Sequence, residues 1–225
     1  LYVILPFEKE FFELKHNYPV KFLGHPLVDS ISNFKKNYDS SKEQIISNKK
    51  PVIAILPGSR KQEIKKILNT VIKIVEYFPN HQFIVAGAPN IELSYYNSSL
   101  KNKNIKVIEN KTYELLSIST AAIVTSGTAT LETALFKVPQ VVCYKSSYFS
   151  YFIAKLIVKI KYISLVNLIM DQQIVKELIQ QDCNKVNITN ELKKILDLNH
   201  RKSLLIKYDE LTSVLGNYGT SKRVA

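Results

Sequence analysis

The chain has 225 residues, of which 46% are hydrophobic and 22% are charged, so it can bury a core and is neither disordered nor fibrous. Its 31 lysine and arginine residues outnumber its 19 aspartate and glutamate residues, which gives a net charge of +12. This excess either solvates helix faces or indicates an anionic partner, such as nucleic acid, a membrane surface or a phosphorylated substrate. Because the sequence shows no zinc-ligand spacing and no RNA-binding aromatic pattern, we expect no nucleic-acid partner.

Compartment signals in the sequence are consistent with the cytoplasm. There is no secretory signal peptide, and no apolar run approaches the length of a helix that crosses a bilayer. The two cysteines, Cys143 and Cys183, are too few for a disulfide framework and fit a reducing compartment. We therefore expect a cytoplasmic protein.

The first 50 residues differ in pattern from the rest of the chain. Residues 1–29 predict a strand, an amphipathic helix, a second strand and a turn. Residues 30–50 are polar and rich in lysine, with a helical section, and we interpret them as a linker onto a new domain. Because the sequence begins directly on a strand, with Leu1 rather than Met, we expect it to continue a longer protein.

From Pro51 onwards the sequence alternates between apolar runs and helical patterns. A continuous apolar run is typical of a strand that is covered on both faces. Five such strands are predicted at residues 52–56, 82–86, 105–108, 121–125 and 140–144. Their alternation with helices predicts an α/β fold with a Rossmann-like, doubly wound parallel sheet over residues 51–184, followed by C-terminal helices over residues 185–225. In such sheets ligands bind beyond the carboxyl ends of the strands, where the strand order reverses.

A turn of small residues, Ser126-Gly127-Thr128, lies between the fourth predicted strand and a helix. The first N–H groups of a helix have no intrahelical partner and its dipole favours negative charge, so this turn can bind an anion. Gly127 allows a ligand to approach closely, and the hydroxyls of Ser126 and Thr128 can cap the helix or donate to a phosphate. The alternative is an ordinary capped turn without a ligand.

A second loop of this kind, Pro57-Gly58-Ser59-Arg60, follows the first predicted strand. The Arg60 guanidinium offers a charged fork to a phosphate, and the alternative is a surface ion pair with Glu63. The loop lacks the ending of a P-loop and the three-glycine dinucleotide fingerprint. Since there is also no Asp-x-Asp pair, we expect no metal and no cofactor; a nucleotide diphosphate would be neutralised by Arg60, helix N-termini and backbone amides.

Four motifs occur in one order along the chain. They are Gly24-His25-Pro26-Leu27-Val28-Asp29, Leu56-Pro57-Gly58-Ser59-Arg60 with Glu63, Ser126-Gly127-Thr128-Ala129-Thr130-Leu131-Glu132, and Ser164-Leu165-Val166-Asn167-Leu168-Ile169. In this order and spacing they resemble the lipid-A-disaccharide synthase family, GT-B glycosyltransferases of lipopolysaccharide biosynthesis. The resemblance runs from about Tyr2 to Asn184 and includes an expected helix at residues 175–178. Val166 departs from the family, which usually has proline before the asparagine.

The resemblance implies a reaction. The family transfers 2,3-diacylglucosamine from its UDP donor to the 6-hydroxyl of 2,3-diacylglucosamine 1-phosphate (lipid X), giving the β-1,6-linked lipid A disaccharide 1-phosphate and UDP. In GT-B enzymes two Rossmann-like domains face each other across a cleft, and the C-terminal one holds most of the nucleotide. Residues 1–29 would be the end of the N-terminal domain and residues 51–184 the UDP-sugar domain. The family's general base is an aspartate of the N-terminal half, so we expect the isolated chain to be inactive.

The resemblance also assigns roles to residues that match the motifs. Arg60 would stabilise the diphosphate as charge develops on the leaving UDP, and Asn167 would lie near the donor diphosphate or sugar. Glu132 would accept hydrogen bonds from the ribose hydroxyls, and its alternative is a solvated glutamate in the first turn of a helix. The full set of expected UDP contacts is Gly58, Ser59, Arg60, Ser126, Gly127, Thr128, Glu132 and Asn167.

A basic amphipathic stretch follows the fifth predicted strand. Its apolar stripe at helical spacing and flanking lysines include Phe149, Phe152, Ile153, Lys155, Leu156 and Lys159. Such a helix can lie in a membrane interface, where apolar burial and attraction to anionic lipid add together. The alternative is a helix that packs on the sheet and directs its lysines to solvent. With a lipid substrate, we expect peripheral association with the inner membrane.

Two other functions remain open at this point. Another UDP-sugar GT-B enzyme, of the N-acetylglucosaminyltransferase or 2-epimerase type, would share the fold and the phosphate loops. Alternatively, the chain is a module that binds nucleotide and membrane without catalysis. The resemblance further implies that some members form homodimers through their C-terminal regions.

Overall fold

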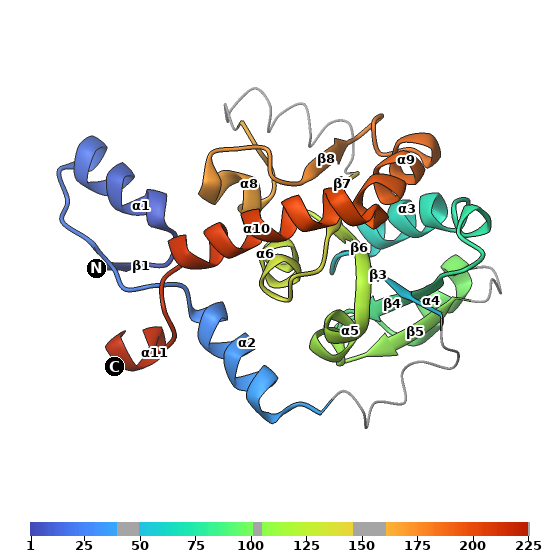
Figure 1. Cartoon of the computed structure of the whole chain (residues 1–225), viewed down its shortest axis with the longest axis horizontal. Coiled ribbons are helices and arrows are strands. Elements are labelled where there is room, and N and C mark those ends of the chain that lie inside the picture. Colours follow the sequence, from blue (N-terminus) through green and yellow to red (C-terminus); the bar gives the residue numbers. More distant parts are fainter. Residues whose placement is uncertain (40–49, 101–104, 146–160, 225) are drawn as a thin grey trace.

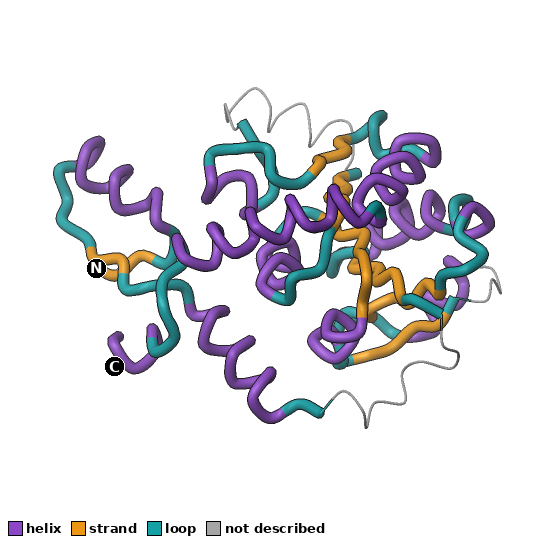
Figure 2. Tube along the Cα trace, in the orientation of Figure 1, coloured by secondary structure: helices purple, strands orange, loops and turns teal. Residues whose placement is uncertain are grey.

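A six-stranded parallel sheet forms the centre of the computed structural model, which describes residues 1–39, 50–100, 105–145 and 161–224. The strands are β3 Val52–Leu56, β4 Gln82–Gly87, β5 Lys106–Glu109, β6 Ser119–Thr125, β7 Gln140–Tyr144 and β8 Lys176–Ile179. Figure 2 shows them together in the part of the molecule away from the two chain termini. The predicted α/β fold with a parallel sheet is confirmed.

The strand order β5-β4-β3-β6-β7-β8 places the reversal point between β3 and β6. From β3 the chain adds β4 and then β5 on one side, and from β6 it adds β7 and β8 on the other. All five residues of β3 are buried, because helices cover both faces of the sheet, as the unbroken apolar run predicts. A ligand crevice is therefore expected beyond the carboxyl ends of β3 and β6.

Helices flank the sheet along its length. They are α3 Lys61–Val71, a 3₁₀ turn at Val75–Tyr77, α4 Leu93–Leu100, α5 Thr112–Ile118, α6 Thr128–Leu135, α8 Leu165–Met170, α9 Lys185–Leu196 and α10 Leu198–Val214. Helix α5 packs on β3 and β4, α6 packs on β6 and β7, and α9 packs on β6, β7 and β8. Buried residues of α9 and α10 belong to the same hydrophobic core as the sheet, so this core continues beyond residue 184.

The expected helix at residues 175–178 is wrong, because this segment is the edge strand β8. Four residues are too few for the apolar period to separate a strand from a helix. The tertiary structure decides, since Lys176 to Ile179 pair in parallel with Val141 to Tyr144 of β7. Asn167 lies on α8, a helix that was not among the predicted elements.

The N-terminal part forms its own small unit beside the sheet. It contains β1 Tyr2–Val3, α1 Pro6–Glu10, a π-helical turn at Phe11–Lys15, β2 Lys21–Phe22 and α2 Pro26–Asn37, and β1 pairs in parallel with β2. The expected turn at residues 24–29 is only partly correct, because α2 begins at Pro26 and continues to Asn37, within the segment that was interpreted as a linker. Proline is favoured at the first helical position, and Nδ1 of His25 caps the helix by accepting from the Leu27 N–H at 3.1 Å.

The C-terminal end returns to this N-terminal unit. Helix α10 leads away from α9 towards β1, and the short helix α11 Thr220–Val224 lies beside α2 (Figure 1). The buried carboxylate of Asp29 accepts hydrogen bonds from the N–H groups of Gly219 and Ser221, both at 2.7 Å. We call this contact the terminal clasp: Asp29 together with residues 219–221. It joins segments that are 190 residues apart.

The terminal clasp should weaken in acid. Burial raises the pKa of Asp29, but the N–H donors of Ser221 and Gly219 outweigh burial, so the pKa lies below its ordinary value. A carboxylate with a lowered native pKa contributes stability above its unfolded pKa and loses that contribution as the pH falls through the native value. Replacing Asp29→Asn should therefore cost about 1–2 kcal/mol of unfolding free energy at neutral pH, and less in acid.

Urea unfolding of parent and variant over a pH series measures this difference. Asp182→Asn is a matched control, because Asp182 is exposed, and it should change stability little at any pH. A difference between parent and Asp29→Asn that stays constant down to the acid limit would contradict the role of the charge.

No described helix is long and apolar enough to cross a membrane. The expected membrane-contact residues lie outside the described part of the chain. These are Phe149, Phe152, Ile153, Lys155, Leu156 and Lys159.

Candidate functional site

A cavity of about 460 Å³ lies at the carboxyl ends of β3, β4, β6 and β7, where the strand order reverses. The structure brings both predicted loops to its wall. The expected contacts that line it are Gly58, Ser59, Arg60, Ser126, Gly127, Thr128 and Glu132. Loops that are more than 60 residues apart in sequence therefore meet at one site, because β3 and β6 are neighbours in the sheet.

Helix α6 presents its N-terminus to this cavity without a side-chain cap. Gly127 is the N-cap residue and has φ 148°, in the region that favours glycine. Within the described residues, the N–H groups of Thr128 and Ala129 have no hydrogen-bond partner. The Ser126 hydroxyl does not cap the helix, because it donates to the carbonyl of Ile163 at 2.6 Å. This terminus can therefore donate backbone hydrogen bonds to an anion.

Helix α3 also begins at the wall of this cavity. Arg60 is its N-cap residue, and no side chain caps this helix either. Gly58 has φ 93°, and a Cβ atom there would lie 3.3 Å from Cγ2 of Thr125 and 3.0 Å from Oε2 of Glu63. Glycine thus lets the two loops approach closely. Two uncapped helix N-termini at one cavity concentrate positive potential there.

Arg60 forms the ion pair that was the alternative interpretation. Its Nη1 lies 3.0 Å from Oε1 of Glu63, and the Arg60 side chain is 80% exposed. The Glu63 side chain is only 13% exposed, but the Arg60 end of the pair lies in water, so the pair contributes little to stability. A guanidinium has five N–H donors, and Arg60 donates to Glu63 only through Nη1. Its other N–H groups can therefore bind a ligand at the cavity wall.

Glu132 lies one turn into α6 and is half-buried at the cavity. Its Oε1 accepts a hydrogen bond from the Tyr113 hydroxyl at 3.1 Å. Burial raises the pKa of Glu132, and the hydrogen bond from Tyr113 opposes that rise. This is not a solvated surface glutamate, which was its alternative interpretation.

Asn167 is not brought to the cavity. Its side chain is fully buried, and Nδ2 donates to the carbonyl of Val175 at 2.9 Å and to Oε1 of Glu177 at 2.8 Å. Its Oδ1 accepts from the N–H groups of Ile174 and Val175. With both ends of the amide engaged, Asn167 fastens the turn after α8 to β8. These hydrogen bonds could not be predicted from the sequence, because the partners of Asn167 lie on β8 or directly before it, and this strand was not predicted.

The comparison with known families decides the identity. A family model described as lipid-A-disaccharide synthetase matches residues 1–218. The chain belongs to this family. It is 34% identical over 228 residues to the lipid-A-disaccharide synthase of Coxiella burnetii (strain Dugway 5J108-111), covering 99% of this chain and 60% of that protein. The Sulfurihydrogenibium enzyme is 33% identical, with 99% and 62% covered. The chain therefore spans about 60% of the length of the lipid-A-disaccharide synthases that it matches.

Solved structures of other proteins share the fold of this chain. The UDP-GlcNAc 2-epimerase of Neisseria meningitidis, bound to UDP-GlcNAc, superposes with a TM-score of 0.64 at 16% identity, over 99% of this chain and 58% of that one. The complex of S. aureus MnaA with UDP gives a TM-score of 0.68 at 16% identity, with the same coverage of both chains. These likenesses show the fold, which is the one expected for the C-terminal domain of a GT-B protein.

Several residues that line this cavity were not among the expected UDP contacts, although Leu56, Pro57, Glu63 and Ala129 belong to the motifs quoted from the sequence. They are Leu56, Pro57, Glu63, Ala86, Gly87, Ala88, Pro89, Thr112, Thr125, Ala129 and Tyr144. Thr125 is the most informative, because its Oγ1 is buried without a hydrogen-bond partner in the described residues. A buried hydroxyl without a partner at a cavity wall is a donor that a ligand can satisfy. The rule that ligands lie beyond strand ends could have indicated Gly87, which ends β4.

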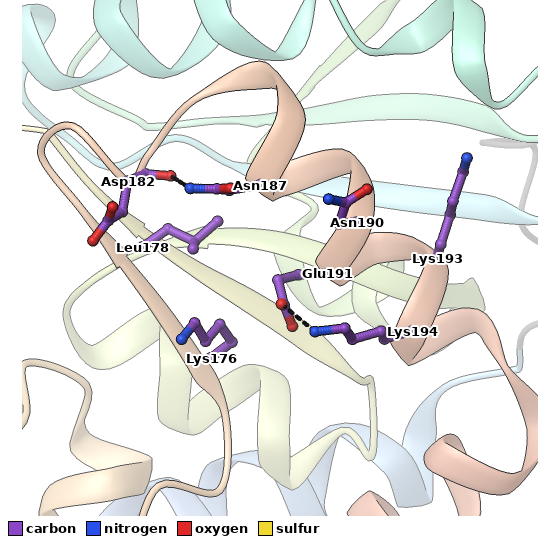
Figure 3. Close-up of a pocket in the computed structure, with 8 residues that line it drawn as sticks. All are labelled: Lys176, Leu178, Asp182, Asn187, Asn190, Glu191, Lys193 and Lys194. Atoms are coloured by element: carbon purple, nitrogen blue, oxygen red, sulfur yellow. Dashed lines mark hydrogen bonds and ion pairs between the residues drawn. The ribbon is translucent and has the colours of Figure 1, made fainter.

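A larger hollow of about 550 Å³ lies between β8 and α9 (Figure 3). Its charged groups include an ion pair between Glu191 and Lys194 at 2.7 Å, and Asn187 donates to the carbonyl of Asp182 at 3.0 Å. None of the predicted site residues lines it. The cavity at the reversal point is therefore the stronger candidate, because helix N-termini and an arginine converge there.

Proposed function

We propose that this chain is the UDP-sugar-binding portion of an enzyme that transfers 2,3-diacylglucosamine from UDP to lipid X. Membership in the lipid-A-disaccharide synthase family supports the reaction. The observation that carries the proposal is the cavity at the reversal point, where two uncapped helix N-termini and Arg60 converge. Such an arrangement suits a nucleotide diphosphate.

In this proposal Ser126, Gly127 and Thr128 bind the diphosphate through the N-terminus of α6. Arg60 leaves Glu63 and stabilises the negative charge that develops on the leaving UDP, which is worth more at this site than in water. Glu132 accepts from the ribose hydroxyls. Asn167 takes part as a positioning residue: it holds Glu177, whose Oε2 accepts from the Ile163 N–H at 3.0 Å, and the Ile163 carbonyl holds Ser126.

Two measurements test this function. Calorimetry on the 225-residue chain should show that UDP binds at the cavity. A UDP-release assay with UDP-2,3-diacylglucosamine should require lipid X and the longer protein, because the proposed general base lies outside this chain. Release of UDP that does not depend on lipid X, or epimerisation of UDP-GlcNAc, would instead favour an enzyme of the 2-epimerase type. Failure of the chain to bind UDP would remove the basis of the proposal.

We also propose that residues 149–159 attach the protein to an anionic membrane surface, where its lipid substrates reside. The support is the sequence pattern and the net charge of +12. Replacing Phe149, Phe152 and Lys155 together by alanine should abolish most flotation with anionic liposomes, and added salt should weaken flotation of the parent.

A matched control for this experiment lies on α10. Ile206 is 60% exposed and Lys202 is exposed, so replacing both by alanine removes an apolar and a basic side chain from a different part of the chain. This variant should float like the parent. Unchanged flotation of the triple variant would exclude the proposed membrane contact.

A further inference from the structure

We propose that Tyr113 is a positioning residue for nucleotide recognition: it holds one oxygen of Glu132 so that the other accepts from the ribose hydroxyls. This inference rests on the nucleotide site proposed above. Oε1 of Glu132 accepts from the Tyr113 hydroxyl at 3.1 Å, while the carboxylate lies at the wall of the 460 Å³ cavity. An ionised carboxylate has a second oxygen with free lone pairs, which can accept from a diol.

Tyr113 reaches Glu132 from behind the site. Tyr113 does not line the 460 Å³ cavity; it lines a neighbouring hollow of about 380 Å³, together with Phe34. Thr112, the preceding residue, lines both spaces. The Tyr113–Glu132 pair therefore stands between the two hollows. From this position the tyrosine acts on a ligand through the glutamate and not by direct contact.

Two phenylalanine rings pack against the Tyr113 ring and restrict its position. Its centroid lies 5.4 Å from that of Phe34 on α2 and 5.2 Å from that of Phe136, which directly follows α6. Phe34 and Phe136 also contact each other edge to face, at 5.8 Å. Ring pairs at these distances are favourable, so the hydroxyl is presented to Glu132 with little freedom. Burial and the charge of Glu132 raise the pKa of Tyr113, so the hydroxyl keeps its proton as a donor.

The hydrogen bond from Tyr113 also favours the ionised carboxylate of Glu132, which is the form that accepts hydrogen bonds from a diol. Burial raises the pKa of Glu132, which would favour the neutral acid, and the Tyr113 hydroxyl counters this by donating to the carboxylate. Without this donor, the carboxylate can rotate and would lose both its orientation and part of its charge. The expected consequence is weaker recognition of the ribose, with unchanged recognition of the diphosphate.

The test compares two ligands on the 225-residue chain by calorimetry: UDP and 2′,3′-dideoxy-UDP, which lacks the ribose diol. In Tyr113→Phe, the affinity for UDP should fall about fivefold to tenfold, which is the worth of one ordinary hydrogen bond. The affinity for 2′,3′-dideoxy-UDP should not change. In a Glu132→Ala background, Tyr113→Phe should add nothing further, because the tyrosine acts only through the glutamate.

Tyr218→Phe is the matched control. It removes a hydroxyl that donates to Asn33 at 2.8 Å on the same helix as Phe34, away from the cavity, and it should leave both affinities unchanged. Thermal melting of each variant reports whether the fold is kept. Equal losses for both ligands in Tyr113→Phe would show a merely structural role and overturn the inference. Unchanged UDP affinity in that variant, with a parent that binds UDP, would overturn the inference alone, whereas a parent that binds neither ligand would overturn the nucleotide site as well.

Discussion

Replacing Asn167→Ala is expected to lower the free energy of unfolding by about 3–5 kcal/mol, because it leaves several buried polar groups unpaired. The amide serves the carbonyl of Val175, the carboxylate of Glu177 and two backbone N–H groups, and its side chain is fully buried. Urea unfolding of the 225-residue chain, followed by circular dichroism, measures the loss. At urea concentrations where Asn167→Ala is still folded, its UDP affinity should fall only to the extent that the loop at Ser126 is displaced.

Two further variants sharpen this result. Asn190→Ala removes an exposed asparagine from α9 and should change stability by less than about 0.5 kcal/mol. Asn167→Asp keeps the shape of the side chain but places a second carboxylate against Glu177. The two negative charges repel each other, so the loss of stability should be largest at neutral pH. It should decrease as the pH falls and one of the two carboxyls is protonated. If Asn167→Ala unfolds like the parent yet abolishes turnover of the full-length enzyme, Asn167 contacts substrate and our positioning role is wrong.

Replacing Arg60→Ala is expected to weaken UDP binding by about 10- to 100-fold. The estimate is the worth of one hydrogen bond between charged groups, and it exceeds what the pair with Glu63, whose Arg60 end lies in water, contributes to stability. Melting should therefore be nearly unchanged while affinity falls, and calorimetry with UDP separates the two effects. In the full-length enzyme, turnover should fall further than affinity, since charge on the leaving group grows in the transition state.

The controls for Arg60 separate charge from geometry. Lys65→Ala removes a positive charge from an exposed position on the same helix, away from the cavity, and it should bind UDP like the parent. Arg60→Lys keeps the charge but loses the planar fork, so its affinity should lie between those of the parent and Arg60→Ala. An Arg60→Ala variant with parental affinity would reduce Arg60 to the surface ion pair seen with Glu63.

Local patterns in the sequence were sufficient for most of the sheet. The strands at 52–56 and 140–144 have the predicted bounds, and the apolar spacing of α3 buries Ile64, Ile67, Leu68 and Val71 as its helical period requires. Segment 176–179 was misassigned because its strand exists only by pairing with β7. The start of α2 at Pro26 was hidden by its resemblance to a turn, although proline at the first helical position and a capping histidine were both present in the sequence.

In the candidate site too, the local features could be predicted from the sequence and the long-range contacts could not. The glycine turns at Gly58 and Gly127 and the N-termini of α3 and α6 that follow them can be read from neighbouring residues, because backbone conformation and helix dipoles are local properties. The side-chain partners are not local. Tyr113 faces Glu132 across 19 residues, and Ser126 is held by Ile163 across 37 residues.

What the sequence determined by itself is therefore the alternation of strands and helices and the two loops that can hold an anion. Only the tertiary structure decided that these loops share one cavity, that Asn167 serves the frame around it, and that Asp29 binds the far end of the chain. The physical reason is that apolar periods and turn residues act over a few positions, whereas a buried polar side chain takes whichever partner the packed sheet brings to it.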